Sequence, residues 1–171
     1  MKTIQILLLF ISFTVSAQTA QTKVGTIDID FVLSQMPEIT NVQNAVEAYG
    51  KTLDADLSTK VEGYQKLVEE YTKNDVTYTI NQRKTMQDSI INSETDINKY
   101  RQNATQLITI KRDEELAPLY KKIGESLEKV AKSQGYTQVM ERNSNLVYID
   151  NNFDLTIAVL KDMGIEVKEK E

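Results

Sequence analysis

Cysteine, histidine and tryptophan are all absent from this 171-residue chain. Without cysteine there are no disulfides and no thiol nucleophile, and without histidine there is no imidazole for acid–base chemistry. Together these absences remove nearly all zinc and copper sites. Carboxylates remain as possible ligands for Mg²⁺ or Ca²⁺, but no run of alternating Asp and Asn ends in the Glu of an EF-hand loop. We therefore expect no cofactor.

Proline and glycine are also scarce, with 2 and 6 residues respectively, which argues against a loop-rich or disordered chain. Charge is unbalanced towards acids. Once residues 1–17 are set aside, 19 basic and 25 acidic residues remain, a net charge of −6. Such a chain is not expected to bind nucleic acid, and bulk electrostatics disfavours contact with an anionic membrane surface.

The first 17 residues have the pattern of a secretory signal peptide. Lys2 supplies a positive charge, an apolar run extends from Ile4 to Phe13, and small residues precede Gln18. The run is about half of the roughly 20 residues that a membrane-spanning helix needs. A buried N-terminal helix is the alternative, but the run has no amphipathic face. We expect export with cleavage after Ala17.

Residues 37–118 carry the periodicity of two long helices. Apolar residues recur at spacings of three and four from Val42 to Tyr71, and a second stripe runs from Met86 to Val130 before Gly135. The interruption between the stripes places the tip near residues 74–81. At 1.5 Å per residue the helices reach roughly 50 and 75 Å, so they must project as an arm. The short connection makes them antiparallel.

Pro118 lies inside the second of these helices. A proline there removes one backbone hydrogen bond and clashes with the preceding turn, at a cost of about 3 kcal/mol. We expect a bend where the arm meets the rest of the chain, and a kink without consequence is the alternative.

Residues 18–36 and 119–171 are predicted to form a base that contains strands. Residues 23–29 alternate in the manner of a strand, and residues 136–140 and 146–149 flank a polar turn, which predicts a β-hairpin. Asp30, Pro37 and Asp154 are expected to begin the helices that follow them. The fold class is thus α+β, mainly α: a long antiparallel coiled-coil hairpin on a small β-containing base.

A three-stranded base would leave open sheet edges, which predicts association between subunits. The expected interface residues are Val24, Ile27, Ile29, Val139, Leu146 and Tyr148.

The order of these elements is typical of one family, and five short motifs accompany it. They are Val24-Gly25-Thr26-Ile27-Asp28, Met36-Pro37-Glu38, Leu116-Ala117-Pro118, Gly135-Tyr136-Thr137-Gln138-Val139 and Leu160-Lys161-Asp162-Met163-Gly164. In this order the chain resembles the Skp/OmpH family over nearly everything after Ala17. The resemblance implies an ATP-independent holdase chaperone of the periplasm. It also implies a homotrimer whose three arms enclose a cavity for unfolded outer-membrane proteins.

The charge of this chain departs from that family, whose best-known members are strongly basic. Either its clients differ in charge, or capture relies on apolar and aromatic contacts. The candidate client-binding residues near the tip are Tyr64, Tyr71, Val76, Tyr78 and Ile80. Tyr64 and Tyr71 lie on the apolar stripe, so packing inside the hairpin is their alternative role. The basic residues of the arm can form local positive patches or a solvated helix face.

Two other classes of function are alternatives to the chaperone. A structural or adaptor protein of the cell envelope would dock its hairpin onto one folded partner. An enzyme is not expected, because the chain has no phosphate-binding loop and no nucleophile beside a base. Asp28 and Asp30, like Asp54 and Asp56, are two residues apart, a spacing that does not share one face of a helix.

Overall fold

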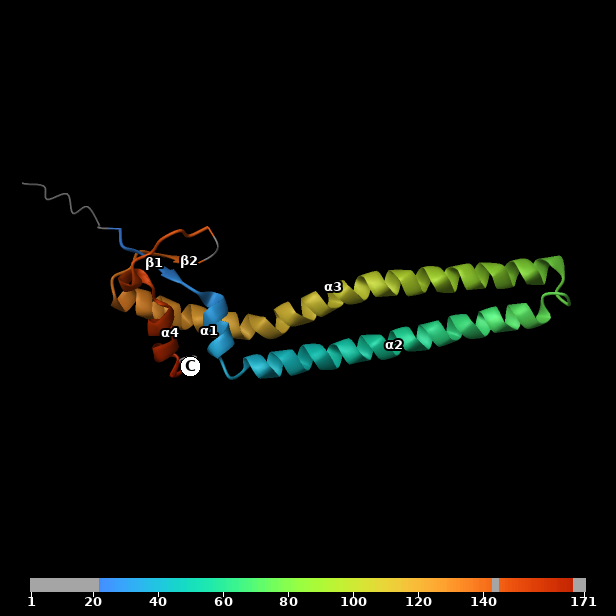
Figure 1. Ribbon diagram of the computed structural model, residues 1–171, viewed down its shortest axis with the longest axis horizontal. Coiled ribbons are helices and arrows are strands. Elements are labelled where there is room, and N and C mark those ends of the chain that lie inside the picture. The colour runs from blue at the N-terminus through green and yellow to red at the C-terminus, as the bar shows by residue number, and fades with distance from the viewer. Residues whose placement is uncertain (1–21, 143–144, 168–171) are drawn as a thin grey trace, which may run out of the picture.

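A two-helix hairpin extends from a small mixed base in the computed structural model (Figure 1), which describes residues 22–142 and 145–167. The predicted signal peptide lies outside these residues. The elements in chain order are β1 (Val24–Ile27), α1 (Ile29–Gln35), α2 (Ile39–Asn74), α3 (Ile80–Ser133), β2 (Gln138–Glu141), the 3₁₀ helix η1 (Asn151–Phe153) and α4 (Thr156–Asp162). The main-α fold with a small sheet agrees with the predicted class.

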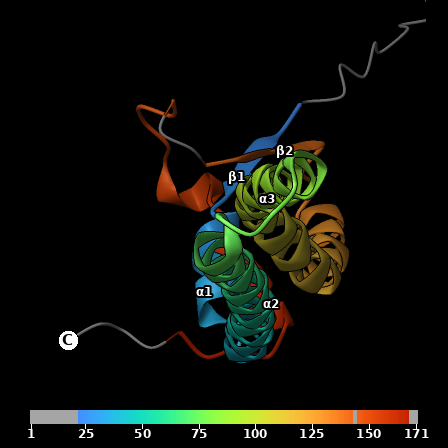
Figure 2. The same ribbon diagram turned by 90° about the vertical axis from the view of Figure 1, so that its right-hand side faces the viewer.

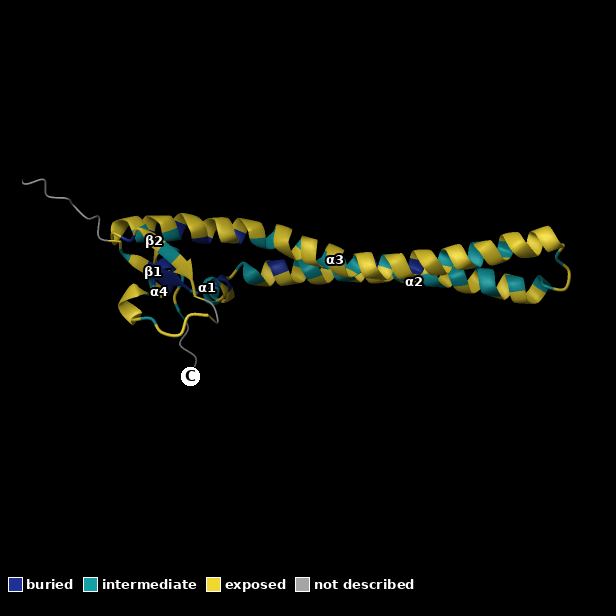
Figure 3. Ribbon diagram, turned by 90° about the horizontal axis from the view of Figure 1, so that it is seen from above, coloured by how far each residue is buried: buried dark blue, intermediate teal, exposed yellow. Residues whose placement is uncertain are grey.

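The hairpin consists of α2, 36 residues long, and the distal part of α3, which has 54 residues in all. The two helices run side by side in opposite directions (Figures 1 and 2). Leu53 of α2 and Ile97 of α3 are buried in the seam, and the other stripe positions of α2 are buried or half-buried. The outward faces are exposed along the arm (Figure 3). The predicted antiparallel arm is therefore confirmed, with its tip at residues 75–79.

Two helix starts differ slightly from prediction. Asp28, and not Asp30, caps α1, because its Oδ1 accepts a 2.9 Å hydrogen bond from the backbone N–H of Phe31. Asp30 then lies in the first turn, where its negative charge suits the helix dipole. Helix α2 begins at Ile39 with Glu38 as its N-cap, two residues after the expected start at Pro37.

The predicted β-hairpin is wrong. Strand β2 pairs in parallel with β1, in a register that places Val24 opposite Gln138 and Ile27 opposite Glu141. Residues 146–149 belong to no strand. The other side of β1 is occupied as well, since the Leu155 N–H donates to the Thr26 carbonyl at 2.8 Å. Alternating residues indicate a strand but do not specify its partner, and β1 had no free side left for a third strand.

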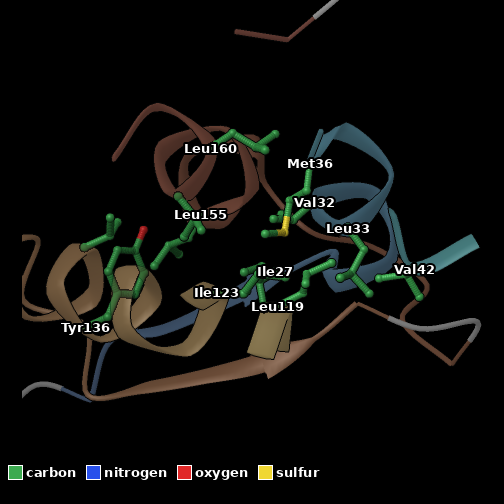
Figure 4. Packing of buried hydrophobic residues seen from close by; sticks show 12 residues of the cluster. Ile27, Val32, Leu33, Met36, Val42, Leu119, Ile123, Tyr136, Leu155 and Leu160 are labelled. Atoms are coloured by element: carbon green, nitrogen blue, oxygen red, sulfur yellow. The ribbon is translucent and has the colours of Figure 1, made fainter. Parts of the chain in front are cut away.

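The core of the base collects side chains from β1, α1, α3 and α4 around Ile27, Val32 and Leu160 (Figure 4). Each fully buried aliphatic side chain of this kind contributes about 1.5–3 kcal/mol. Gly25 allows the closest approach, because a Cβ at this position would lie 2.5 Å from Leu155 Cδ1 and 2.9 Å from the Tyr136 ring. Only glycine fits there without a shift of the core.

Helix α3 bends in its gold-coloured part, where it enters the base (Figure 1). Pro118 lies within this helix and leaves the Glu114 carbonyl without its usual donor. Beyond the proline, Leu119 faces the core, whereas Tyr120 is exposed. The apolar face therefore follows Leu116, Leu119 and Ile123 at spacings of three and four. Within residues 22–142 and 145–167, no helix combines the length and apolarity needed to cross a membrane.

Candidate functional site: arm tip, arm seam and base

The arm tip is a short loop held by several hydrogen bonds. The N–H groups of Thr77 and Tyr78 donate to the Asn74 carbonyl at 2.8 and 3.1 Å. Thr79 and Gln82 form a capping box, with the Thr79 N–H donating to Gln82 Oε1 at 3.0 Å. These bonds satisfy the backbone groups that a helix start leaves free, so the loop has a defined shape.

An arginine ties the two helices together at this loop. Arg83 donates from Nη2 to the Asp75 carbonyl at 2.7 Å, and its Nε lies 3.0 Å from Asp75 Oδ1. The loop therefore presents its outward side chains from a fixed backbone. Those side chains include Val76, which is 90% exposed, and Ile80, which is 87% exposed.

Tyr78 is less free than its place in the sequence suggested. Its ring packs against that of Tyr71 with centroids 6.4 Å apart, and the Tyr71 hydroxyl accepts a 2.7 Å hydrogen bond from Gln87 Nε2. Both rings are half-buried, as is Tyr64 in the seam. Of the five candidate client-binding residues, only Val76 and Ile80 are freely exposed in this chain.

A polar contact interrupts the apolar seam midway along the arm. The Tyr100 hydroxyl of α3 donates to Asp56 Oδ2 of α2 at 3.3 Å, and Lys60 Nζ lies 5.3 Å from the Tyr100 ring centroid. Desolvation raises the pKa of Tyr100, and the negative charge of Asp56 raises it further. Such a cross-helix contact favours this register of the two helices.

Ion pairs connect the arm and α4 to the proximal part of α3. Lys122 Nζ lies 2.9 Å from Glu38 Oε1, and this hydrogen bond lowers the pKa of Glu38. Lys129 pairs with Asp162, whose pKa is lowered first by that bond and then by the Ser126 hydroxyl, which donates at 2.9 Å. Ser126 is buried between α3 and α4. The apolar stripe did not predict a buried residue at position 126, because serine interrupts the apolar pattern.

Arg142 joins three segments at the other end of the base. Its guanidinium lies 3.1 Å from Asp154 Oδ2 and 3.4 Å from Asp28 Oδ2. Asp154 Oδ1 also accepts a 2.9 Å bond from the Thr156 N–H, so this residue helps to start α4 although Leu155 holds the N-cap position. The two carboxylates are thus held by an arginine and by helix caps, an arrangement that stabilises the base.

The predicted interface residues differ in how much surface they offer. Tyr148 is 81% exposed, Val24 and Leu146 are also exposed, and Ile29 and Val139 are half-buried. Ile27 is 2% exposed, so its side chain is already inside the core of its own chain and is removed from the interface set. Val147 and Met140, not singled out from the sequence, add exposed apolar surface nearby, with Val147 98% exposed.

The exposed surfaces at the tip and on the base include apolar side chains. Over the part of the chain that the structure describes, no group of three or more acidic residues is arranged to hold a metal ion. The ion pairs at the tip and on the base join residues of the same chain, and Val76, Ile80 and Val147 are apolar side chains left exposed. These surfaces can associate with other apolar chains through the hydrophobic effect.

Comparison with known proteins agrees with this architecture. A crystal structure from Caulobacter crescentus CB15, described as a candidate outer membrane chaperone (OmpH-like), superposes with a TM-score of 0.64 at 11% identity. The match covers 88% of this chain and 89% of that one, which shows a common fold. No curated protein sequence matches the chain. The family model "Outer membrane protein (OmpH-like)" matches residues 23–163. The chain therefore belongs to the OmpH-like family.

Proposed function

We propose that this protein is an ATP-independent holdase chaperone of the periplasm, which keeps unfolded outer-membrane proteins soluble. Family membership and the name given to the C. crescentus protein support a chaperone role. The single observation that carries the proposal here is the tip, where two almost fully exposed aliphatic residues, Val76 in the loop and Ile80 at the first position of α3, stand on a backbone that hydrogen bonds hold in place. Exposed aliphatic side chains on a fixed backbone can bind apolar side chains of an unfolded chain through the hydrophobic effect.

The arm, residues 37–118, holds the client in this proposal, and the base, residues 18–36 and 119–171, assembles the subunits. We propose a homotrimer. The support is the exposed apolar set on the base, formed by Met140, Leu146, Val147 and Tyr148. Three arms around one axis would enclose a cavity, and the bend near Pro118 would set their direction.

Capture by apolar contact suits the charge of the chain. The formal net charge is −5, so general attraction of acidic clients is not available. Val76 and Ile80 carry no charge, and many weak apolar contacts would hold a client while leaving it mobile. We therefore propose that the tip grips apolar side chains of the unfolded client, with Tyr71 and Tyr78 as flanking aromatic surface.

A holding assay tests this function. An unfolded β-barrel membrane protein is diluted from urea into buffer with one equivalent of assembled protein, and aggregation is followed by light scattering. Wild type should suppress aggregation without ATP. The double variant Val76→Ser/Ile80→Ser should suppress it less, because it loses the exposed apolar pair.

Ile91→Ser is the matched control, since Ile91 is an exposed aliphatic residue of α3 away from the tip. If wild type fails to keep the client soluble, the chaperone proposal is wrong. If a pull-down instead gives one folded protein in stoichiometric amount, the adaptor class replaces it.

Assembly has its own test, namely light scattering of the purified protein at micromolar concentration. We expect the mass of three chains, and Tyr148→Asp should weaken the assembly because it would place a charge in a dry interface. A monomeric wild type would contradict the trimer. Since Tyr148 is exposed within one chain, the substitution should leave the protomer folded.

A further inference from the structure

A groove lies at the root of the arm, between the first turns of α2 and the part of α3 just before Pro118. Its volume is about 410 Å³. Four apolar residues form its floor: Ile39, Val42, Val46 and Leu116. The polar residues at its rim are Gln43, Glu47 and Arg112. The volume falls within the roughly 300–1,000 Å³ of typical ligand pockets, so it has room for a bulky side chain.

The position of the groove follows from the two prolines of the chain. Pro37 precedes the start of α2 at Ile39, and Pro118 follows Leu116 in α3. The regular side-by-side packing of α2 and α3 therefore ends at the same position along the arm in both helices. Ile39, Val46 and Leu116 pack against the core of the base on one side and remain only half-buried. The apolar floor is thus left partly open.

Arg112 is the one basic residue that lines the groove. Glu47 is paired with Lys51 at 2.7 Å. Glu115, the acidic residue one turn from Arg112 on α3, is paired with Lys111 at 2.6 Å. Arg112 is exposed and makes no ion pair with any residue in the described ranges. A guanidinium next to an apolar floor suits a ligand that combines a carboxylate with an apolar group.

We propose that this groove binds an extended segment of an unfolded client through a bulky apolar side chain in sequence next to an aspartate or glutamate. The apolar side chain would lie on Leu116 and Val46, with the carboxylate on Arg112. This inference rests on the proposed chaperone function and adds to it a second contact, at the opposite end of the arm from the tip. The groove would also give this acidic protein one local site, at Arg112, that binds acidic segments of a client.

Another cavity near the arm root, lined in part by Met36, Ser126 and Met163, is less suited to this role. Both of its lysines are already occupied, since Lys122 pairs with Glu38 and Lys129 with Asp162. Neither lysine is therefore free to bind a carboxylate of a client.

Site-specific crosslinking tests the groove. A benzoylphenylalanine replaces Gln43, which lines the groove, or Asn44, the adjacent exposed residue that does not. Each intact protein is irradiated with an acetylated, amidated hexapeptide of glycine and serine that contains adjacent aspartate and phenylalanine. Parallel peptides carry lysine in place of the aspartate, or alanine in place of the phenylalanine.

We expect crosslinking at position 43 to exceed that at position 44, and to require both the aspartate and the phenylalanine. Arg112→Glu should lower crosslinking of the aspartate peptide about five-fold or more, and should raise that of the lysine peptide. Arg101→Glu makes the same charge change on an exposed position of α3 outside the groove and should do neither.

Equal crosslinking at positions 43 and 44, or equal crosslinking of the aspartate and lysine peptides, would overturn the proposal. So would equal effects of the two arginine variants. A failure of the groove proposal can be distinguished from a failure of the proposed chaperone function. A wild type that keeps an unfolded client soluble but shows no preference at position 43 retains the function and loses the groove. A wild type that fails in the holding assay loses the function itself.

Discussion

Lys122 of α3 donates a 2.9 Å hydrogen bond to Glu38 at the N-cap of α2, joining residues 84 positions apart in the sequence. The contact spans the junction of arm and base, because Glu38 begins the arm while Lys122 lies one turn past Pro118. The linker at residues 36–38 joins the base to α2 through the chain. The Lys122–Glu38 hydrogen bond adds a direct polar contact between the start of α2 and the proximal part of α3.

Removing this ion pair should loosen the arm more than it destabilises the protein. Both side chains are more than a third exposed, so Glu38→Gln should lower the free energy of unfolding by only about 0.5 kcal/mol. Spin labels on the arm and the base should nevertheless report a broader distance distribution. Glu125→Gln is the control, because Glu125 approaches Lys121 only at 3.9 Å. An unchanged distribution would show that packing alone fixes the arm.

Acid should destabilise the base through Glu38 and Asp162. Their hydrogen bonds with Lys122 and Lys129 lower both pKa values in the folded state. A lowered pKa stabilises the fold above the unfolded-state values, near 4.5 and 3.8, and this contribution is lost as pH falls through the folded-state pKa values. Thermal unfolding between pH 7 and pH 3 should show a decline that Glu38→Gln/Asp162→Asn reduces. An equally steep decline in the double variant would contradict this assignment.

Gly25 and Gly124 should respond in opposite ways to alanine. Gly25→Ala places a methyl group 2.5 Å from Leu155 Cδ1, so we expect a loss of about 1–3 kcal/mol from overpacking. Gly124→Ala, in the last third of α3, meets no atom within 4 Å and should gain roughly 0.5–1 kcal/mol of helix stability. Urea unfolding of the two variants measures both effects. A neutral Gly25→Ala would mean that the core of the base adapts more readily than its packing indicates.

Replacing Pro118 should straighten α3. Alanine restores the N–H that can donate to the Glu114 carbonyl and removes the clash of the ring, so the helix itself should gain up to about 3 kcal/mol. The direction of the arm relative to the base should change as well, which small-angle scattering detects as a different maximum dimension. If neither stability nor dimension changes, the bend has another origin.

Sequence patterns predicted the arm well because the features that specify it are spacings between residues close together in the sequence. Each stripe from Val42 to Tyr71 and from Met86 onward is set by spacings of three and four residues, and the short break between them leaves one direction for the return helix. Gly135 and Gly164, both with a φ of +72°, follow the ends of α3 and α4, where this left-handed conformation favours glycine. These features depend on neighbours in the chain.

The base was less predictable because its contacts are distant. Whether residues 138–141 would pair with residues 146–149 or with β1 depends on which edge is free once α4 is in place, and alternation does not carry that information. Leu119 and Ser126 were missed because the face of α3 changes partner at the base, from α2 to α4. The groove at Arg112 likewise appears only once residues about 70 positions apart come together.

The parallel pairing of β1 with β2 has a consequence for the architecture as a whole. The Lys23 backbone meets Thr137 across 114 residues, with the complete hairpin inserted between them. Strand β1 can therefore pair with β2 only after the two long helices have brought the chain back to the base. This pairing joins residues far apart in the sequence and is expected to form late in folding. Because the hairpin returns the chain to where it left, whole heptads can be added to or removed from both helices without disturbing the base. The length of the arm can thus change in this fold without a change in the base.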